Sequence, residues 1–154
     1  MTPVQYGDTG WPAWRCGNLV YYRNYKCATT FYLHIFKTWE EITTHDIDWE
    51  KDHVFSYIRD PIERYRSGIA EFLFSLFRFN ITLKDDIIND SEFIKLMAHV
   101  PYFDGHSVPV SKIFNEKIQK IDWIPIDVEG IDHVKMTRYL LSKYGIEMDF
   151  SILD

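Results

Sequence analysis

The sequence predicts an α/β domain with three layers, in which helices cover both faces of a short, central, parallel sheet. Two apolar segments, 19–22 and 53–58, are rich in β-branched and aromatic residues, which is typical of buried strands. Each is followed by a short polar segment and then by a stretch with helical apolar spacing. A third apolar segment, 121–126, precedes an amphipathic stretch at 130–144, so strands and helices alternate along the chain.

The composition indicates one folded, acidic domain that spans residues 1–154. Hydrophobic residues make up 46% of the chain and aromatic residues 17%, which argues against disorder. The formal net charge of −6 disfavours a nucleic-acid binder or a highly sulfated acceptor. No segment approaches the ~20 apolar residues of a membrane span, and the N-terminus lacks the pattern of a signal peptide. We therefore expect a cytoplasmic protein, with Cys16 and Cys27 as reduced thiols.

The elements are expected in the following order. Residues 1–17 form an irregular N-terminal flap or a short hairpin, and the core spans 18–145. The first strand, 19–22, leads through a polar loop into a helix that runs to about residue 41. A polar connection with at most one helical turn, 43–52, precedes the second strand at 53–58.

The second helix carries strong start signals. Asp60 suits the N-cap, Pro61 the first helical position, and Glu63 the third position of a capping box. Its apolar residues predict one stripe facing the core: Ile62, Tyr65, Ile69, Phe72, Leu73, Leu76 and Phe79. One or two short helices over 80–98 and a loop over 99–112 follow. The last helix, 130–144, ends at Gly145.

The loop after the first strand has the layout of an anion-binding site. A lysine, Lys26, and two threonines, Thr29 and Thr30, lie between a strand and a helix whose first amides would face an anion. The arrangement is P-loop-like, but the pattern G-x-x-x-x-G-K-[ST] is absent. A second cation, Arg59, comes at the end of the next strand, where ligands bind in open α/β sheets. Ser67 lies about 10 Å further along the second helix.

Both segments resemble motifs of the sulfotransferase family, in particular its carbohydrate and membrane-associated branch. Residues 25–30 are similar to the family's P-K-x-G-[ST]-[ST] loop, and residues 59–67 match its strand-R-D-P-x-x-R-x-x-S motif. The resemblance implies a minimal sulfotransferase fold and the donor 3′-phosphoadenosine 5′-phosphosulfate (PAPS), with adenosine 3′,5′-bisphosphate (PAP) as product and without a metal. The nucleotide-binding residues that it implies are Arg23, Lys26, Cys27, Ala28, Thr29, Thr30, Arg59 and Ser67.

In the family's chemistry, Lys26 would also act catalytically by neutralising the leaving phosphate. A histidine would act as general base toward the acceptor hydroxyl. We favour His106, which lies in a segment similar to the family's D-x-H-x-x-P-Q, and then His45. The sequence departs from the family's loop at Tyr25 and Ala28, and Ala28 is compatible with the loop only if its φ is negative.

Three functions are compatible with these residues. The leading one is sulfuryl transfer to a hydroxyl of a carbohydrate or of another small or protein-bound acceptor. Because the chain is short, the acceptor cleft is expected to be open or completed by a second subunit. A non-catalytic nucleotide- or partner-binding module is the alternative, favoured by the changes at Tyr25 and Ala28. A nucleotide kinase is disfavoured by the missing glycines.

Overall fold

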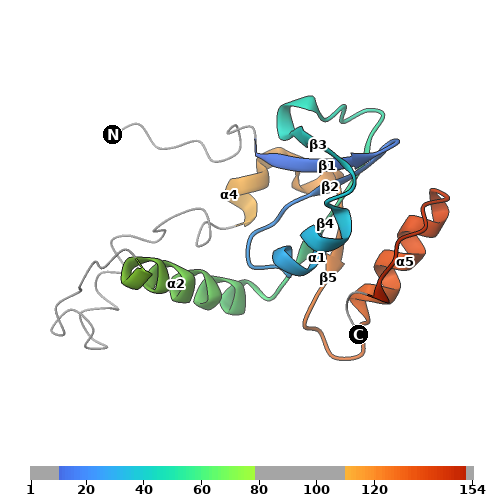
Figure 1. The fold of residues 1–154 in the computed structure, drawn as a ribbon. Coiled ribbons are helices and arrows are strands. Elements are labelled where there is room, and N and C mark those ends of the chain that lie inside the picture. The colour runs from blue at the N-terminus through green and yellow to red at the C-terminus, as the bar shows by residue number, and fades with distance from the viewer. Residues whose placement is uncertain (1–10, 79–109, 152–154) are drawn as a thin grey trace, which may run out of the picture.

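The structure is a computed structural model that describes residues 11–78 and 110–151. It contains a five-stranded mixed sheet with the strand order β3-β1-β2-β4-β5 (Figure 1). The strands are β1 (Pro12–Cys16), β2 (Leu19–Tyr22), β3 (Glu40–Thr43), β4 (His53–Ile58) and β5 (Ile121–Pro125). The helices are α1 (Thr29–Phe36), α2 (Pro61–Arg78), α4 (Val110–Phe114) and α5 (His133–Lys143).

The three predicted strands are confirmed, and they form the parallel part of the sheet. β2 pairs in parallel with β4, and β4 pairs in parallel with β5. All of β2 is buried, as expected of a central strand. The carboxyl ends of these three strands therefore lie along one edge of the sheet.

The other two strands were not predicted as such. β1 is antiparallel to β2 and forms the hairpin alternative for the N-terminal segment, with Gly17 at a φ of 59° in the turn. Residues 12–16 are therefore part of the sheet and not a flap. β3 pairs with β1 where the first helix was expected to continue, because α1 ends at Phe36. Only Ile42 of β3 is buried, which is typical of an edge strand.

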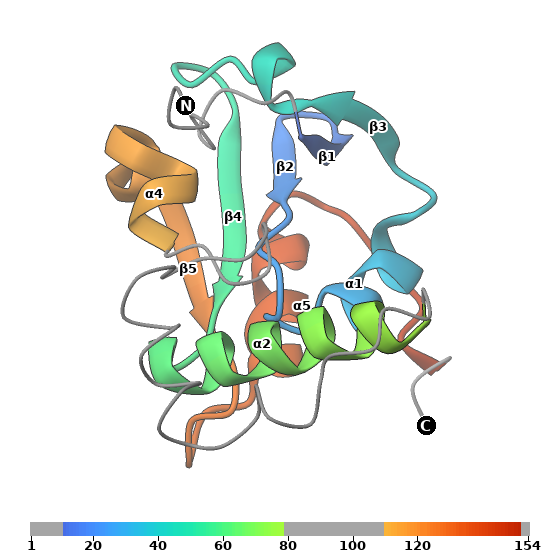
Figure 2. The same ribbon diagram turned by 90° about the vertical axis from the view of Figure 1, so that its left-hand side faces the viewer.

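Side chains alternate between two hydrophobic clusters, one on each face of the sheet. Leu19 and Tyr21 of β2 point toward the face covered by α1 and α5, whereas Val20 and Tyr22 point toward the face covered by α4. The period of two is that of a strand with both faces buried. Figure 2 shows α5 and α4 on opposite sides of the parallel strands. The α/β class is confirmed, with helices on both faces of a mixed sheet.

α2 begins at the carboxyl end of β4 and extends beyond the sheet (Figure 1). The predicted cap is confirmed, because Asp60 Oδ1 accepts hydrogen bonds from the amides of Ile62 and Glu63, both at 3.0 Å. Ile62 of the expected core-facing stripe is 61% exposed, Tyr65 and Ile69 are half-buried, and the other side chains of the stripe lie outside the described residues. The helix places Arg64 against the loop after β2 and leaves Ile62 toward solvent.

α5 agrees with the predicted last helix. Asp132 caps it by accepting from the amide of Lys135 at 3.0 Å, and Gly145 follows it with a φ of 66°. The helices expected over 80–98, and the loop with His106, lie outside the described residues. Among the helices that are described, none is both long and apolar enough to cross a membrane.

Candidate anion site at the carboxyl edge of the sheet

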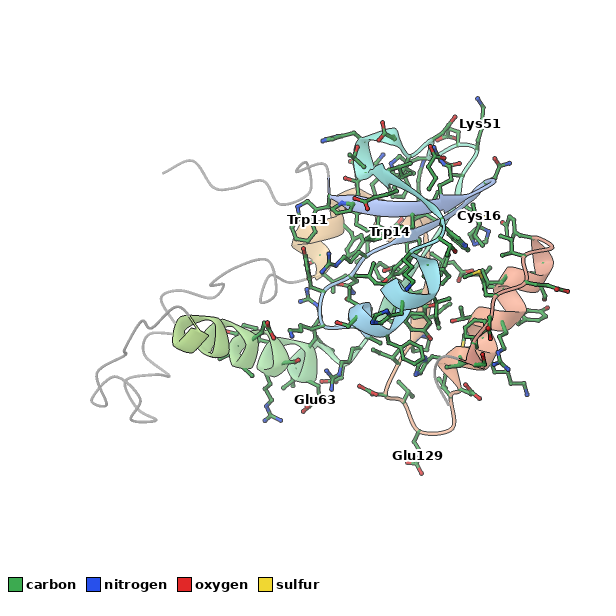
Figure 3. All side chains as sticks on the ribbon, in the orientation of Figure 1. Trp11, Trp14, Cys16, Lys51, Glu63 and Glu129 are labelled. Atoms are coloured by element: carbon green, nitrogen blue, oxygen red, sulfur yellow. The ribbon has the colours of Figure 1, made fainter. Side chains whose placement is uncertain are left out.

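Three chain segments meet at the carboxyl edge of the parallel strands. The loop 23–28 follows β2, Arg59 follows β4, and Asp127 comes shortly after β5. Figure 3 shows Glu63 of α2 and Glu129, which follows β5, at this end of the molecule, whereas Lys51 lies at the opposite end. The structure thus brings Lys26 and Arg59 to the same edge, as their positions after parallel strands predicted.

The backbone at this edge is strained. The described residues include three non-glycine residues with positive φ: Lys26 (62°), Ala28 (54°) and Asp127 (55°). The condition of a negative φ at Ala28 is not met, because Ala28 adopts the left-handed conformation with ψ 32°. That conformation costs an L-residue roughly 1–2 kcal/mol. Ala28 thus takes the backbone conformation for which glycine is suited, at the position where the related motif has glycine.

The left-handed residues shape the start of α1. Lys26 and Ala28 have positive φ and Cys27 between them does not. Alternation of left-handed and right-handed residues can turn successive amides into a concave nest that binds anions. No side chain caps α1, and its first helical hydrogen bond runs from the amide of Tyr32 to the carbonyl of Ala28 at 3.0 Å. The amides of the first turn can therefore face an anion outside the helix.

Buried polar contacts hold the loop in this shape. Asn24 is 1% exposed, and its Nδ2 donates to the carbonyl of Tyr57 at the end of β4, at 2.9 Å, and to Cys27 Sγ at 3.3 Å. Thr29 Oγ1 donates to the carbonyl of Asn24 at 2.8 Å. The Thr29 hydroxyl, predicted as a ligand donor, therefore closes the loop, whereas Thr30 is exposed.

Cys27 is part of the packing under the loop. Its side chain is 1% exposed, and burial raises the pKa of the thiol to about 11. The thiol therefore stays protonated at neutral pH and accepts a hydrogen bond from Asn24. Its backbone, not its sulfur, is the part that can contribute to an anion site.

Two of the predicted cations pair with carboxylates. Lys26 Nζ lies 3.1 Å from Glu71 Oε2 of α2. Arg59 Nε lies 2.8 Å from Asp127 Oδ2, but its N–H is not directed at that oxygen, so the contact is an ion pair and not a hydrogen bond. The guanidinium of Arg23 lies 4.4 Å from the ring centre of Tyr25, and its buried Nε has no hydrogen-bond partner among the described residues.

α2 presents one face to the loop. Arg64 Nε donates to the carbonyl of Tyr25 at 3.0 Å, and Glu71 contacts Lys26. Positions 64, 67, 68 and 71 fall within an arc of about 100° at 3.6 residues per turn. Ser67 is half-buried and Gly68 is buried on this face, so the predicted ligand Ser67 lies between two residues that contact the loop.

Of the two predicted histidines, His45 alone lies within the described residues. His45 is exposed, in a 3₁₀ turn at Thr44–Asp46 that follows the edge strand β3. In both Figure 1 and Figure 2 that turn lies at the opposite end of the domain from α2. One strand, β1, separates β3 from β2. The amide of Thr44, next to His45, donates to the carbonyl of Trp11 at 2.8 Å, and the centre of the Trp11 ring lies 4.9 Å from that of Tyr25 in the Lys26 loop. His106 lies outside the described residues.

Sequence reasoning missed several residues of this edge. His133 opens α5, and its Nδ1 lies 2.5 Å from the hydroxyl of Tyr32 on α1. Arg64 is 3% exposed, and desolvation lowers its pKa. The carboxylates Glu71 and Asp127 could not have been found from sequence, since long-range packing brings them to the cations. Arg64 was visible as the second arginine of R-D-P-x-x-R-x-x-S, but it had no assigned role.

The described residues contain no group of three or more His, Cys, Asp or Glu side chains arranged to hold a metal ion. Compared with known proteins, the chain matches no protein-family model, and neither the curated proteins nor the solved structures gave a match.

Proposed function

We propose that the protein is a sulfotransferase that transfers the sulfuryl group of PAPS to a hydroxyl of a carbohydrate or of another small or protein-bound acceptor. The observation that supports this best is the left-handed backbone of Lys26 and Ala28 in front of an uncapped helix. Left-handed residues of this kind occur in the concave nests whose successive amides bind phosphate. The resemblance to the sulfotransferase motifs identifies which phosphate compound the loop would bind.

Two anion sites on neighbouring strands suit the two ends of this donor. β2 and β4 are adjacent in the sheet, and adjacent strands lie about 4.8 Å apart. The loop after β2 would bind the 5′-phosphosulfate through its amides, Lys26 and Thr30. Arg59 and Ser67, after β4, would bind the 3′-phosphate. Asn24 connects the two strand ends, because its side chain, in the loop after β2, donates to the carbonyl of Tyr57 near the end of β4.

The proposed reaction is an in-line displacement at sulfur. The acceptor oxygen forms a bond to sulfur while the bond from sulfur to the bridging oxygen of the donor breaks. Lys26 neutralises the charge that develops on this bridging oxygen, and PAP leaves. The hydroxyl proton passes to a general base. His106 remains the favoured candidate from sequence, with His45 second, and the structure adds His133, which contacts α1.

A specific observation favours the non-catalytic alternative as second candidate. Both cations at the loop and at the end of β4 already pair with carboxylates, Glu71 and Asp127. Such pairs could serve the fold alone. In a sulfotransferase, the donor phosphates would replace these carboxylates.

Calorimetric titration separates the candidates. We expect the wild type to bind adenosine 3′,5′-bisphosphate more tightly than ATP, and Arg59→Ala to lose most of that affinity. Arg66→Ala is the matched control, because Arg66 is exposed on α2, the helix that follows Arg59, and pairs with Glu63 at 2.8 Å. Tighter binding of ATP would favour a kinase, and binding of neither nucleotide would favour a structural module. Transfer from labelled PAPS to a panel of acceptors then tests catalysis.

A further inference from the structure

We propose that Arg64 is a positioning residue that fixes the anion-binding conformation of the loop after β2 from its place on α2. The inference rests on the proposed nucleotide site and adds to it a link between its two halves. Arg64 lies one and a half turns after Arg59, in the same motif, but it faces the loop at the end of the neighbouring strand.

The burial of Arg64 is the first argument. Arg64 is 3% exposed, and desolvation lowers the pKa of its guanidinium. Arginine is rarely buried to this extent unless its donors are used. In this structure Nε donates to the carbonyl of Tyr25 at 3.0 Å, and the guanidinium also lies beside Cys27.

The position of this contact is the second argument. Tyr25 immediately precedes Lys26, the first of the two left-handed residues in the loop. A hydrogen bond from a charged donor fixes the peptide unit that joins Tyr25 and Lys26, because its carbonyl accepts the bond. The φ of Lys26 is defined about the bond next to that peptide. Arg64 therefore acts directly on the strained backbone that forms the nest.

The covalent connection is the third argument. Arg64 belongs to the rigid start of α2, where its amide donates to the carbonyl of Asp60 at 2.8 Å. Arg59, the proposed 3′-phosphate ligand, directly precedes this turn. Movement of the helix start on binding a 3′-phosphate would thus be transmitted to the loop through Arg64. The 5′-phosphosulfate site and the 3′-phosphate site should therefore bind the two ends of the donor cooperatively.

The test compares Arg64→Met with Arg66→Met, the same substitution at an exposed position of the same helix. Calorimetry measures binding of adenosine 5′-monophosphate, adenosine 3′-monophosphate and adenosine 3′,5′-bisphosphate. We expect Arg64→Met to weaken the 5′-monophosphate and the bisphosphate about tenfold and the 3′-monophosphate less than twofold. Arg64→Lys keeps the positive charge and a hydrogen-bond donor, and it should recover part of the lost affinity. It also replaces Arg64→Met in the test if that variant fails to fold.

Hydrogen exchange on the ligand-free protein is the second readout. Amides of residues 24–30 should exchange faster in Arg64→Met, while those of β4 stay protected as in the wild type. Equal weakening of both monophosphates, or unchanged exchange in the loop, would overturn the positioning role. If the wild type binds neither monophosphate, the proposed function fails, and the exchange data alone then decide whether Arg64 holds the loop.

Discussion

Replacement of Ala28 by glycine tests the strained loop directly. Ala28 has φ 54° and ψ 32°, a conformation that costs alanine roughly 1–2 kcal/mol and glycine almost nothing. Glycine loses about 0.4–1 kcal/mol through the greater freedom of the unfolded chain. The half-buried methyl group of Ala28 packs against the cluster under α1 and α5, and its loss costs about 0.4 kcal/mol, half the value of a fully buried methylene. The sum of these terms runs from about 0.4 kcal/mol of destabilisation to about 1.2 kcal/mol of stabilisation, so Ala28→Gly should leave the free energy of unfolding nearly unchanged or raise it.

Ala70→Gly is the matched control. Ala70 is exposed in the interior of α2, where glycine costs about 1 kcal/mol. Urea denaturation measures both variants, with unchanged m-values as the condition for comparing midpoints. If Ala28→Gly destabilises the protein as much as Ala70→Gly does, Ala28 is not left-handed in solution and the nest does not exist. Ala28→Val should be more harmful than either, because β-branched residues are poorly tolerated at positive φ.

Three further predictions concern single side chains at this edge. Glu71→Gln should tighten binding of adenosine 3′,5′-bisphosphate up to about fivefold in calorimetry. The substitution removes an ion pair with Lys26 that is worth at most ~1 kcal/mol and competes with the ligand. Glu63→Gln is the control and should have no effect. Lys26→Met should lower the rate of sulfuryl transfer at least ~100-fold in a labelled-donor assay and change PAP affinity much less, and equal losses would argue against a role in the transition state. Burial raises the pKa of the Cys27 thiol to about 11. The folded state therefore keeps a proton that the unfolded state loses above pH ~9. The free energy of unfolding should fall by about 2–3 kcal/mol between pH 9 and 11. Urea melts at both pH values should show a smaller fall for Cys27→Ala and an unchanged one for Cys16→Ala.

The parallel core was predictable because local pattern and burial agree there. β4 has the predicted bounds, and β2 is apolar and buried at every position. Of the antiparallel strands, β1 was predicted only as one arm of a possible hairpin and β3 was not predicted, since both depend on pairing at the edge of the sheet. Glu40 and Glu41 of β3 are exposed and have low β-propensity, so nothing local marks them as a strand.

In the candidate site, the positions of the cations were predictable, but the backbone of the loop and the face of α2 were not. Lys26 and Arg59 follow neighbouring parallel strands, and topology alone brings such positions together. The backbone of the loop was not predictable, because residue type argued against a left-handed alanine. Nor was the face of α2, where the apolar spacing that includes Ile62 indicated a core-facing stripe. In the structure, Ile62 is exposed, whereas Arg64 is buried and contacts Tyr25 of the loop.

The location of the strain is an argument for function that does not depend on the motif resemblance. The positive φ values of Lys26, Ala28 and Asp127 all fall where β2 and β5 end, although none of these residues is glycine. Strain of this kind persists only where surrounding contacts determine the conformation, and it concentrates at functional sites. Here Asn24 and Arg64 supply those contacts from buried positions. A turn that served only to reverse the chain would not need two left-handed residues around Cys27, whereas a loop that directs its amides at a phosphate does. Binding of the anion would then offset the cost of the strain.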